Sequence, residues 1–237
     1  GLHWPQTFTV DIVAGNTTRR HEVVMCGKEV TLEIGNADYI IPNSDGRGYG
    51  LFILGDNDRA ALLKHYATIA DEVMRQATIM NLRELYEANY IGNEEWLSAL
   101  ISGLSTERSA LIASTLCGYV AEPLSALRSA EAEAELYAMS QSHALVSCRQ
   151  QILRLLMQTA TSADLCRELY TIWHEAKHPL LNVNDYMTLA YELSLRFPER
   201  YDTIATTQRE RITDEDRRRK FDFIIRSVNP SSEAQER

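Results

Sequence analysis

The spacing of apolar residues changes once along this chain, near residue 54, and this change limits the fold more than any other feature. Before residue 54 apolar residues recur at every second position, which is typical of strands with one buried face. After residue 54 they recur every three or four positions, the period of amphipathic helices. We therefore predict a small strand domain over residues 1–54 and a helical domain over residues 55–237.

The first region contains four or five short runs in which apolar and polar residues alternate. Glycine and asparagine turn signals separate these runs, as in an antiparallel meander. The predicted strands are 7–13, 20–25, 29–34, 38–41 and 49–54. Together they predict a small antiparallel β-sandwich, which buries little surface alone and needs a partner layer.

The second region contains a series of apolar stripes with helical spacing. Clear stripes lie within residues 112–120, 145–156, 165–173, 186–193 and 221–228. The helix that holds Met74 and Tyr86 is apolar over more of its circumference, so we place it between two layers. The run Ser129–Glu135 is a strong helix former, and we expect its glutamates to form a solvated face.

Short polar side chains mark where some of these helices begin. Asn93, Asn182 and Thr213 are predicted N-caps, because their side chains can accept hydrogen bonds from free helical N–H groups. We expect about eight to ten helices with short connections. The fold class is then mainly α, an irregular HEAT-like α-α superhelix preceded by the small β-sandwich.

Composition excludes several classes of partner. Acidic residues outnumber basic ones by 33 to 24, which gives a formal charge of −9 and predicts no nucleic-acid partner. No apolar run approaches the ~18–20 residues that cross a bilayer, so no membrane span is expected. The four cysteines lack metal-binding or disulfide spacing, and we predict structural thiols, with Cys148 and Cys166 on apolar helix faces. Localisation stays unassigned.

One zinc-peptidase signature occurs, at His174-Glu175-Ala176-Lys177-His178. On a regular helix this pattern places two imidazoles on one face, where they can share a zinc ion beside a glutamate base. Pro179 argues against such a helix, because the residue before a proline is displaced from helical geometry. The third ligand is missing too, since Phe197 occupies the position where gluzincins have glutamate. We predict that this motif is not a metal site.

Two other motifs have structural explanations. Gly46-Arg47-Gly48-Tyr49-Gly50 is predicted to turn into the strand at 49–54, because no helix start follows it as in a phosphate loop. Arg217-Arg218-Arg219-Lys220 follows Asp214-Glu215-Asp216, an order that complements a helix dipole and predicts a solvated helix start. No nucleophile-elbow sequence or catalytic-cysteine signature occurs.

Five stretches carry a resemblance to a known family. Asp185-Tyr-Met-Thr-Leu-Ala-Tyr-Glu-Leu193 is followed by Arg196-Phe-Pro-Glu199, and later by Arg211-Ile212 and Asp216-Arg-Arg-Arg-Lys-Phe-Asp-Phe-Ile224. Near the start stands Asn43-Ser-Asp-Gly-Arg-Gly-Tyr49. In order and in sequence these resemble the C-terminal region of the zinc aminopeptidase N family. The chain departs from the family pattern at Asp214-Glu215 and at Arg226-Ser227-Val228.

The resemblance implies an accessory part of a larger enzyme. In that family the zinc ligands and the exopeptidase loop belong to a catalytic domain that precedes the β-sandwich, so no catalytic, cofactor-binding or metal residue is assigned to this chain. The zinc would belong to the parent's catalytic domain, which is the expected partner together with peptide substrates. The helical domain would close over the catalytic domain and enclose the chamber where N-terminal residues are removed.

Two other classes of function remain as alternatives. The chain could be a free-standing HEAT-like scaffold that binds a protein or peptide partner. It could also be an autonomous metalloprotease that uses His174, Glu175 and His178. The first residue, Gly1 rather than Met, is compatible with a cleaved or excised fragment. The resemblance implies that the chain is the C-terminal portion of a longer enzyme and is inactive by itself.

Overall fold

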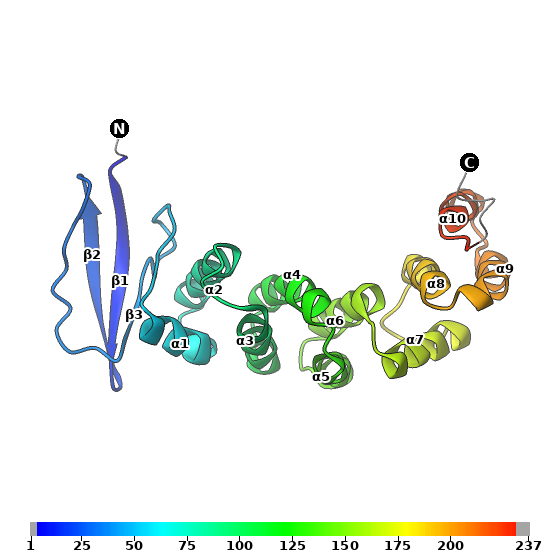
Figure 1. Ribbon diagram of the computed structural model, residues 1–237, viewed down its shortest axis with the longest axis horizontal. Coiled ribbons are helices and arrows are strands. Elements are labelled where there is room, and N and C mark those ends of the chain that lie inside the picture. Colours follow the sequence, from blue (N-terminus) through cyan, green and yellow to red (C-terminus); the bar gives the residue numbers. More distant parts are fainter. Residues whose placement is uncertain (1–3, 231–237) are drawn as a thin grey trace. The chain divides into compact units, whose positions relative to one another are not determined.

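The computed structural model describes residues 4–230 and divides into two compact units, Gly1–Leu127 and Arg128–Arg237 (Figure 1). The described residues are mainly helical, with ten α-helices and one small antiparallel sheet, so the predicted helix-rich class is confirmed. The strands and the first four helices belong to the first unit. The predicted domain boundary at residue 54 therefore falls inside that unit.

The sheet of the first unit has three strands in the order β2-β1-β3. The strands are β1 (Gln6–Ala14), β2 (Thr17–Met25) and β3 (Tyr39–Ile41). A two-residue turn at Gly15-Asn16 joins β1 to β2, and Gly15 adopts the positive φ of 55° that such hairpin turns require. Val10, Ile12 and Val23 are buried on one face of the sheet, and Asp11 and Ile41 are buried on the other.

The predicted strands at 29–34 and 49–54 are wrong, and the described residues contain a single sheet instead of a β-sandwich. Exposure does alternate over 49–54, where Phe52 and Leu54 point inward while Leu51 and Ile53 are exposed. A period of two specifies an extended chain with two unlike faces. A strand also needs a neighbour in register, and within residues 4–230 these two segments have none.

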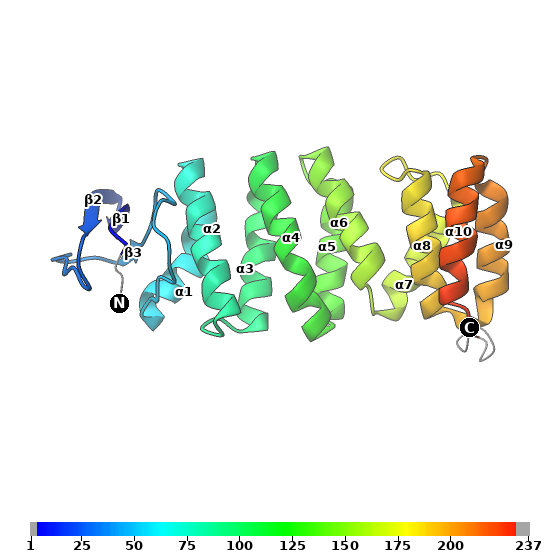
Figure 2. The ribbon, with the colours of Figure 1, turned by 90° about the horizontal axis from the view of Figure 1, so that it is seen from above.

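Four helices complete the first unit. They are α1 (Asp56–His65), α2 (Glu72–Glu87), α3 (Asn93–Thr106) and α4 (Ala110–Leu127), with a 3-10 turn, η1 (Tyr66–Thr68), after α1. Figure 2 shows α2, α3 and α4 side by side. The prediction for the Met74–Tyr86 helix is confirmed, because α2 packs against α1 and α4 and buries nine of its residues.

The helix α4 is long and apolar enough to cross a membrane by length and composition. It packs against α2 and α3 and buries Ile112, Leu116, Val120 and Leu124. A core helix of a soluble fold passes the same test of length and composition. The expectation of no membrane span stays a prediction.

The second unit consists of six helices with short connections. They are α5 (Ala130–Ser142), α6 (Val146–Thr159), α7 (Ala163–Glu175), α8 (Val183–Arg196), α9 (Tyr201–Arg211) and α10 (Glu215–Ser227), with a 3-10 turn, η2 (Pro198–Arg200), before α9. Helices that are consecutive in sequence pack together in the pairs α5–α6, α7–α8 and α8–α9. The predicted stripes form the core, in which Leu156, Leu169, Trp173, Leu193 and Phe221 are fully buried.

The predicted helix caps have three different outcomes. Asn182 is confirmed as the N-cap of α8 and forms a capping box with Asp185. Asn93 is instead the first residue of α3, and its Oδ1 accepts a hydrogen bond from the Tyr86 hydroxyl at 2.7 Å. The cap predicted at Thr213 is wrong by one residue. Asp214 is the N-cap of α10, and its side chain accepts a hydrogen bond from the N–H of Arg217 at 2.8 Å.

Candidate functional site

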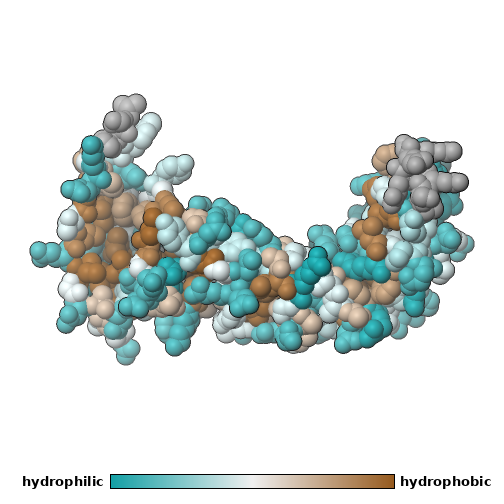
Figure 3. All heavy atoms as spheres, in the orientation of Figure 1, coloured by the Kyte–Doolittle hydropathy of each residue, from teal (hydrophilic) through white to brown (hydrophobic). Residues whose placement is uncertain are grey.

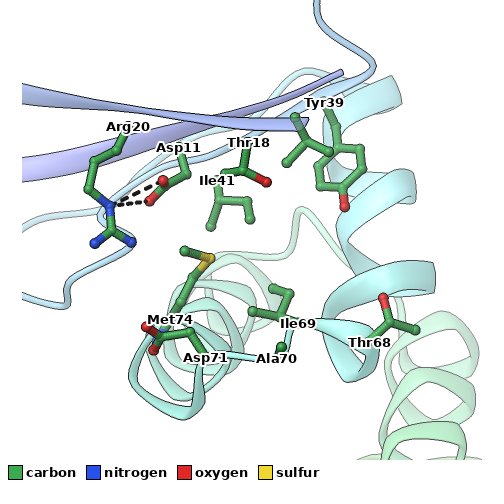
Figure 4. A pocket seen from close by; sticks show the side chains of 11 residues that line it. Asp11, Thr18, Arg20, Tyr39, Ile41, Thr68, Ile69, Ala70, Asp71 and Met74 are labelled. Atoms are coloured by element: carbon green, nitrogen blue, oxygen red, sulfur yellow. Dashed lines mark hydrogen bonds and ion pairs between the residues drawn. The ribbon is translucent and has the colours of Figure 1, made fainter. Parts of the chain in front are cut away.

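A pocket of about 540 Å³ lies in the first unit between the sheet and the start of α2 (Figure 4). The strands provide one wall, with Asp11, Arg20 and Ile41, and the chain from η1 into α2 provides the other, with Ile69 and Met74. Hydrophobic residues also gather over the sheet in the visible face of this unit (Figure 3). We call this cavity the sheet pocket.

The register of the sheet brings the polar residues of the sheet pocket together. Asp11 lies opposite Arg20 across β1 and β2, and opposite Ile41 across β1 and β3. Its carboxylate is almost fully buried and accepts from Arg20 Nε at 3.2 and 3.1 Å, and from the Ser44 hydroxyl. A buried carboxylate needs such partners, because an unpaired charge away from water is strongly unfavourable.

The opposite wall is fixed by a second buried ion pair. Arg75, in the first turn of α2, donates to Glu107 through Nε at 2.9 Å and Nη2 at 3.1 Å, and through Nη1 to the carbonyl of Ile69. Burial alone would raise the pKa of Glu107, but the hydrogen bonds from Arg75, Ser109 and Arg108 outweigh it and hold that pKa below 4.5. The segment that lines the pocket is thereby tied to the C-terminal end of α3, where Glu107 is the C-cap residue.

Both carboxylates that line the sheet pocket already have hydrogen-bond partners. Asp11 is neutralised by Arg20, and Asp71 caps α2 by accepting from the N–H of Met74 at 3.0 Å. The residues that line the pocket include no histidine or cysteine. Both Nη groups of Arg20 lack a partner among the described residues.

The sequence Asn43–Tyr49 forms a compact loop between the sheet and α2, which we call the 43–49 loop. Asn43 has a positive φ of 47°, and its side chain accepts from the N–H of Gly48 at 2.6 Å and donates to the Gly48 carbonyl at 3.1 Å. Asp45 accepts from the backbone N–H of Thr9 on β1 at 3.3 Å. The predicted turn is confirmed here, although the strand expected after it is not formed.

Close packing explains two of the residues in this loop. A Cβ on Gly48 would lie 2.8 Å from Phe52 and 3.1 Å from Phe8, whose rings pack edge to face. From α2, Asn81 donates to the carbonyl of Pro42 at 2.8 Å, which attaches the residue directly before the loop to the helix. The 43–49 loop is therefore a structural connector.

The two histidines of the zinc-like motif do not share a helical turn. The helix α7 ends at Glu175, and Ala176 follows in the left-handed conformation with φ of 53°. His174 stacks on Tyr170, while the His178 N–H donates to the Tyr186 hydroxyl at 2.8 Å and burial lowers the pKa of His178. The predicted helix end before Pro179 is confirmed. Within residues 4–230 no group of three metal-ligating side chains occurs.

The residues of the family-like stretch in the second unit also have structural partners. Asp185 accepts from Arg154 Nε at 2.8 Å and Nη2 at 2.9 Å, which joins α6 to α8. Arg211 donates to the carbonyls of Trp173 and His174 at the end of α7. In the basic run, Arg218 donates to the carbonyl of Ile212, as fits a helix start.

Sequence reasoning missed the buried ionic groups. The pair of Asp11 and Arg20 could have been found, because a two-residue turn at Gly15-Asn16 fixes that register. Glu133 could not, and the prediction of a fully solvated face is wrong at this residue. Its buried carboxylate accepts hydrogen bonds from both the N–H and the hydroxyl of Thr161 and of Ser162.

Comparison with known proteins adds no family. No protein-family model matches the chain, and no curated protein sequence matches it either. The resemblance to the aminopeptidase N family accordingly stays a prediction that depends on the motifs of the chain itself.

Proposed function

We propose that this chain is the C-terminal, non-catalytic part of a zinc-dependent aminopeptidase, an enzyme that removes N-terminal residues from peptides. In that parent enzyme it would cap the catalytic domain and help to form the substrate chamber. The zinc and the catalytic residues would belong to the preceding domain. No residue of this chain is assigned to catalysis or to metal binding.

One observation carries the proposal. The residues that resemble family motifs are those that set the connections between elements, in both units. The 43–49 loop is bound to β1 through Asp45 and Thr9, and Asp185 completes the capping box of α8 while it pairs with Arg154. Motifs preserved for architecture are what the accessory part of a larger enzyme would retain, whereas an independent peptidase would need a catalytic set.

The finer fold assignment belongs to the same proposal. Packing of consecutive helices in the pairs α3–α4, α5–α6 and α7–α8 is the pattern of a HEAT-like α-α array. Such an array offers a broad surface, built from successive helices, that suits the enclosure of a chamber. We propose an irregular array, because no strict internal repeat occurs in the sequence.

The test starts from the reading frame upstream of residue 1. The proposal predicts an upstream His-Glu-x-x-His followed by glutamate nineteen positions after the second histidine. The longer protein should bind zinc and release aminoacyl reporter groups, and this chain alone should do neither. A gene that starts at this N-terminus with its own start codon would instead favour the free-standing scaffold.

A matched variant separates the proposal from the autonomous metalloprotease. If His174, Glu175 and His178 bound zinc, the purified chain would contain zinc in stoichiometric amount, and His174→Ala would remove it. The control is His65→Ala, on α1, far along the chain from the motif. We expect the unmodified chain and both variants to contain no zinc by metal analysis.

A further inference from the structure

The segment Tyr49–Leu54 presents an unpaired edge to solvent. We call it the edge segment. Its outward residues are apolar, with 91% of Tyr49, 43% of Leu51 and 60% of Ile53 exposed. Its inward residues Phe52 and Leu54 pack into the unit. Both faces of the edge segment are therefore apolar, including the face directed to solvent.

The backbone of the edge segment is also unpartnered. The N–H of Tyr49 donates to Gln6 Oε1 at 2.7 Å. From Gly50 to Ile53 no backbone N–H or C=O has a hydrogen-bond partner within residues 4–230. An extended chain with open donors and acceptors is a template for an added strand.

The strand β2, which forms one edge of the sheet, shows how a permanently exposed edge is built. β2 carries charged residues at Arg19, Arg20 and Glu22, and such charges prevent edge-to-edge pairing. The edge segment contains no charged residue and no proline. This difference is expected if β2 stays in solvent and the edge segment is covered by a partner.

The surroundings of the edge segment indicate where its partner comes from. Trp4 and Pro5, through which the polypeptide enters β1, line a groove of about 570 Å³ together with Arg47 and Tyr49. On the other flank a groove of about 400 Å³ lies between the segment and α2, where Met80 is half exposed. Trp4, the first described residue, thus lies beside the edge segment.

We infer that the edge segment is a strand-addition site, and that its occupant is a β-strand from the polypeptide preceding Trp4 in the parent enzyme. This inference rests on the function proposed above, which requires such a preceding part. The added strand would pair with the backbone of residues 50–53, and apolar side chains at every second position would cover Leu51 and Ile53. The pairing would convert the edge segment into a strand.

Hydrogen exchange of backbone amides, followed by mass spectrometry, tests the pairing. In this chain alone, peptides that cover residues 50–54 should exchange at nearly unprotected rates. In the longer protein encoded by the full reading frame the same peptides should exchange at least about tenfold more slowly, because their amides become part of a ladder. Equal exchange in the two proteins would overturn the inference.

A charged substitution provides the matched comparison. Ile53→Lys should leave the melting temperature of this chain unchanged, since the side chain is exposed there, but should restore fast exchange at 50–54 in the longer protein. The control is Val24→Lys on β2, which is 56% exposed and should change neither protein. Slow exchange that persists in the Ile53→Lys variant of the longer protein would contradict strand pairing.

Failure of this inference and failure of the proposed function give different results. A longer protein with aminopeptidase activity but unprotected amides at 50–54 removes the strand-addition site alone. A longer protein with protected amides but without zinc or peptidase activity keeps the site and removes the proposed function.

Discussion

The sheet region, residues 6–54, and the helices from Asp56 onward satisfy their backbone groups in different ways. Each helix closes its own hydrogen bonds, and only its ends need side chains such as Asn182 or Asp214. The sheet region depends on groups far along the chain, as in the bonds from Asn81 to Pro42 and from Tyr49 to Gln6. A sheet region can therefore be left incomplete by a missing neighbour, whereas a helix cannot.

The buried ion pair between helices should give the largest effect on stability. Glu107→Ala leaves the Arg75 guanidinium buried without its partner, and we expect a loss of about 3–5 kcal/mol in the free energy of unfolding. Urea denaturation followed by circular dichroism measures it. Glu84→Ala, at an exposed position of α2, is the control and should change stability by less than about 0.5 kcal/mol. Equal effects of the two would show that the pair does not hold α2 to the end of α3.

Glu133 should make the second unit sensitive to acid. Burial alone would raise the pKa of Glu133, but the hydrogen bonds from Ser162 and Thr161 outweigh it and lower that pKa below 4.5. A lowered pKa in the folded state means that the stabilisation is complete above pH 4.5 and is lost as the pH falls through the folded-state pKa.

The corresponding variant is Glu133→Gln. We expect it to lose about 2–3 kcal/mol at neutral pH, because charge-assisted hydrogen bonds are replaced by weaker ones, and to lose less further stability on acidification than the unmodified chain. Thermal denaturation at several pH values measures both effects. Glu135→Gln, exposed on the same helix, is the control. If the stability of Glu133→Gln falls at acidic pH as steeply as that of the unmodified chain, the role assigned to Glu133 is contradicted.

Close packing in the sheet region gives the next effect. Gly48→Ala would place a methyl group 2.8 Å from Phe52 and 3.0 Å from Asn43 Oδ1, and such overpacking costs about 1–3 kcal/mol. Gly27→Ala is the control in the same region, because nothing lies within 4 Å of its added Cβ. If both variants unfold at the same urea concentration, the 43–49 loop is able to relax and its packing is not decisive.

A helix cap should give the smallest effect. Asn182→Ala removes the acceptor for the N–H groups of Asn184 and Asp185, and we expect a loss of about 1 kcal/mol. Asn184→Ala, two residues later and exposed, should change the urea midpoint far less. A loss as large as that of Glu107→Ala would show that helix ends, and not only side-chain pairs between helices, control stability.

Prediction from sequence succeeded for features that depend on neighbouring residues. It was incomplete for features that depend on residues far apart in the chain. The helix count, the extended burial of α2 and the helix end before Pro179 follow from spacing and from proline geometry. The burial of Glu133 does not, because its partners Thr161 and Ser162 are about thirty residues away. The sheet pocket likewise depends on segments that meet only in the folded chain.

By itself the sequence determined the change of period at residue 54, the apolar stripes and the end of α7 that separates His174 from His178. These features depend on backbone geometry and on neighbours within one or two helical turns. The tertiary structure alone decided which alternating segments became strands and which charges were buried. The physical reason is that a strand and a buried ion both need partners from elsewhere in the chain. For residues 29–34 and 49–54 the described residues supply no partner strand, while for Asp11, Glu107 and Glu133 they supply the hydrogen-bond partners.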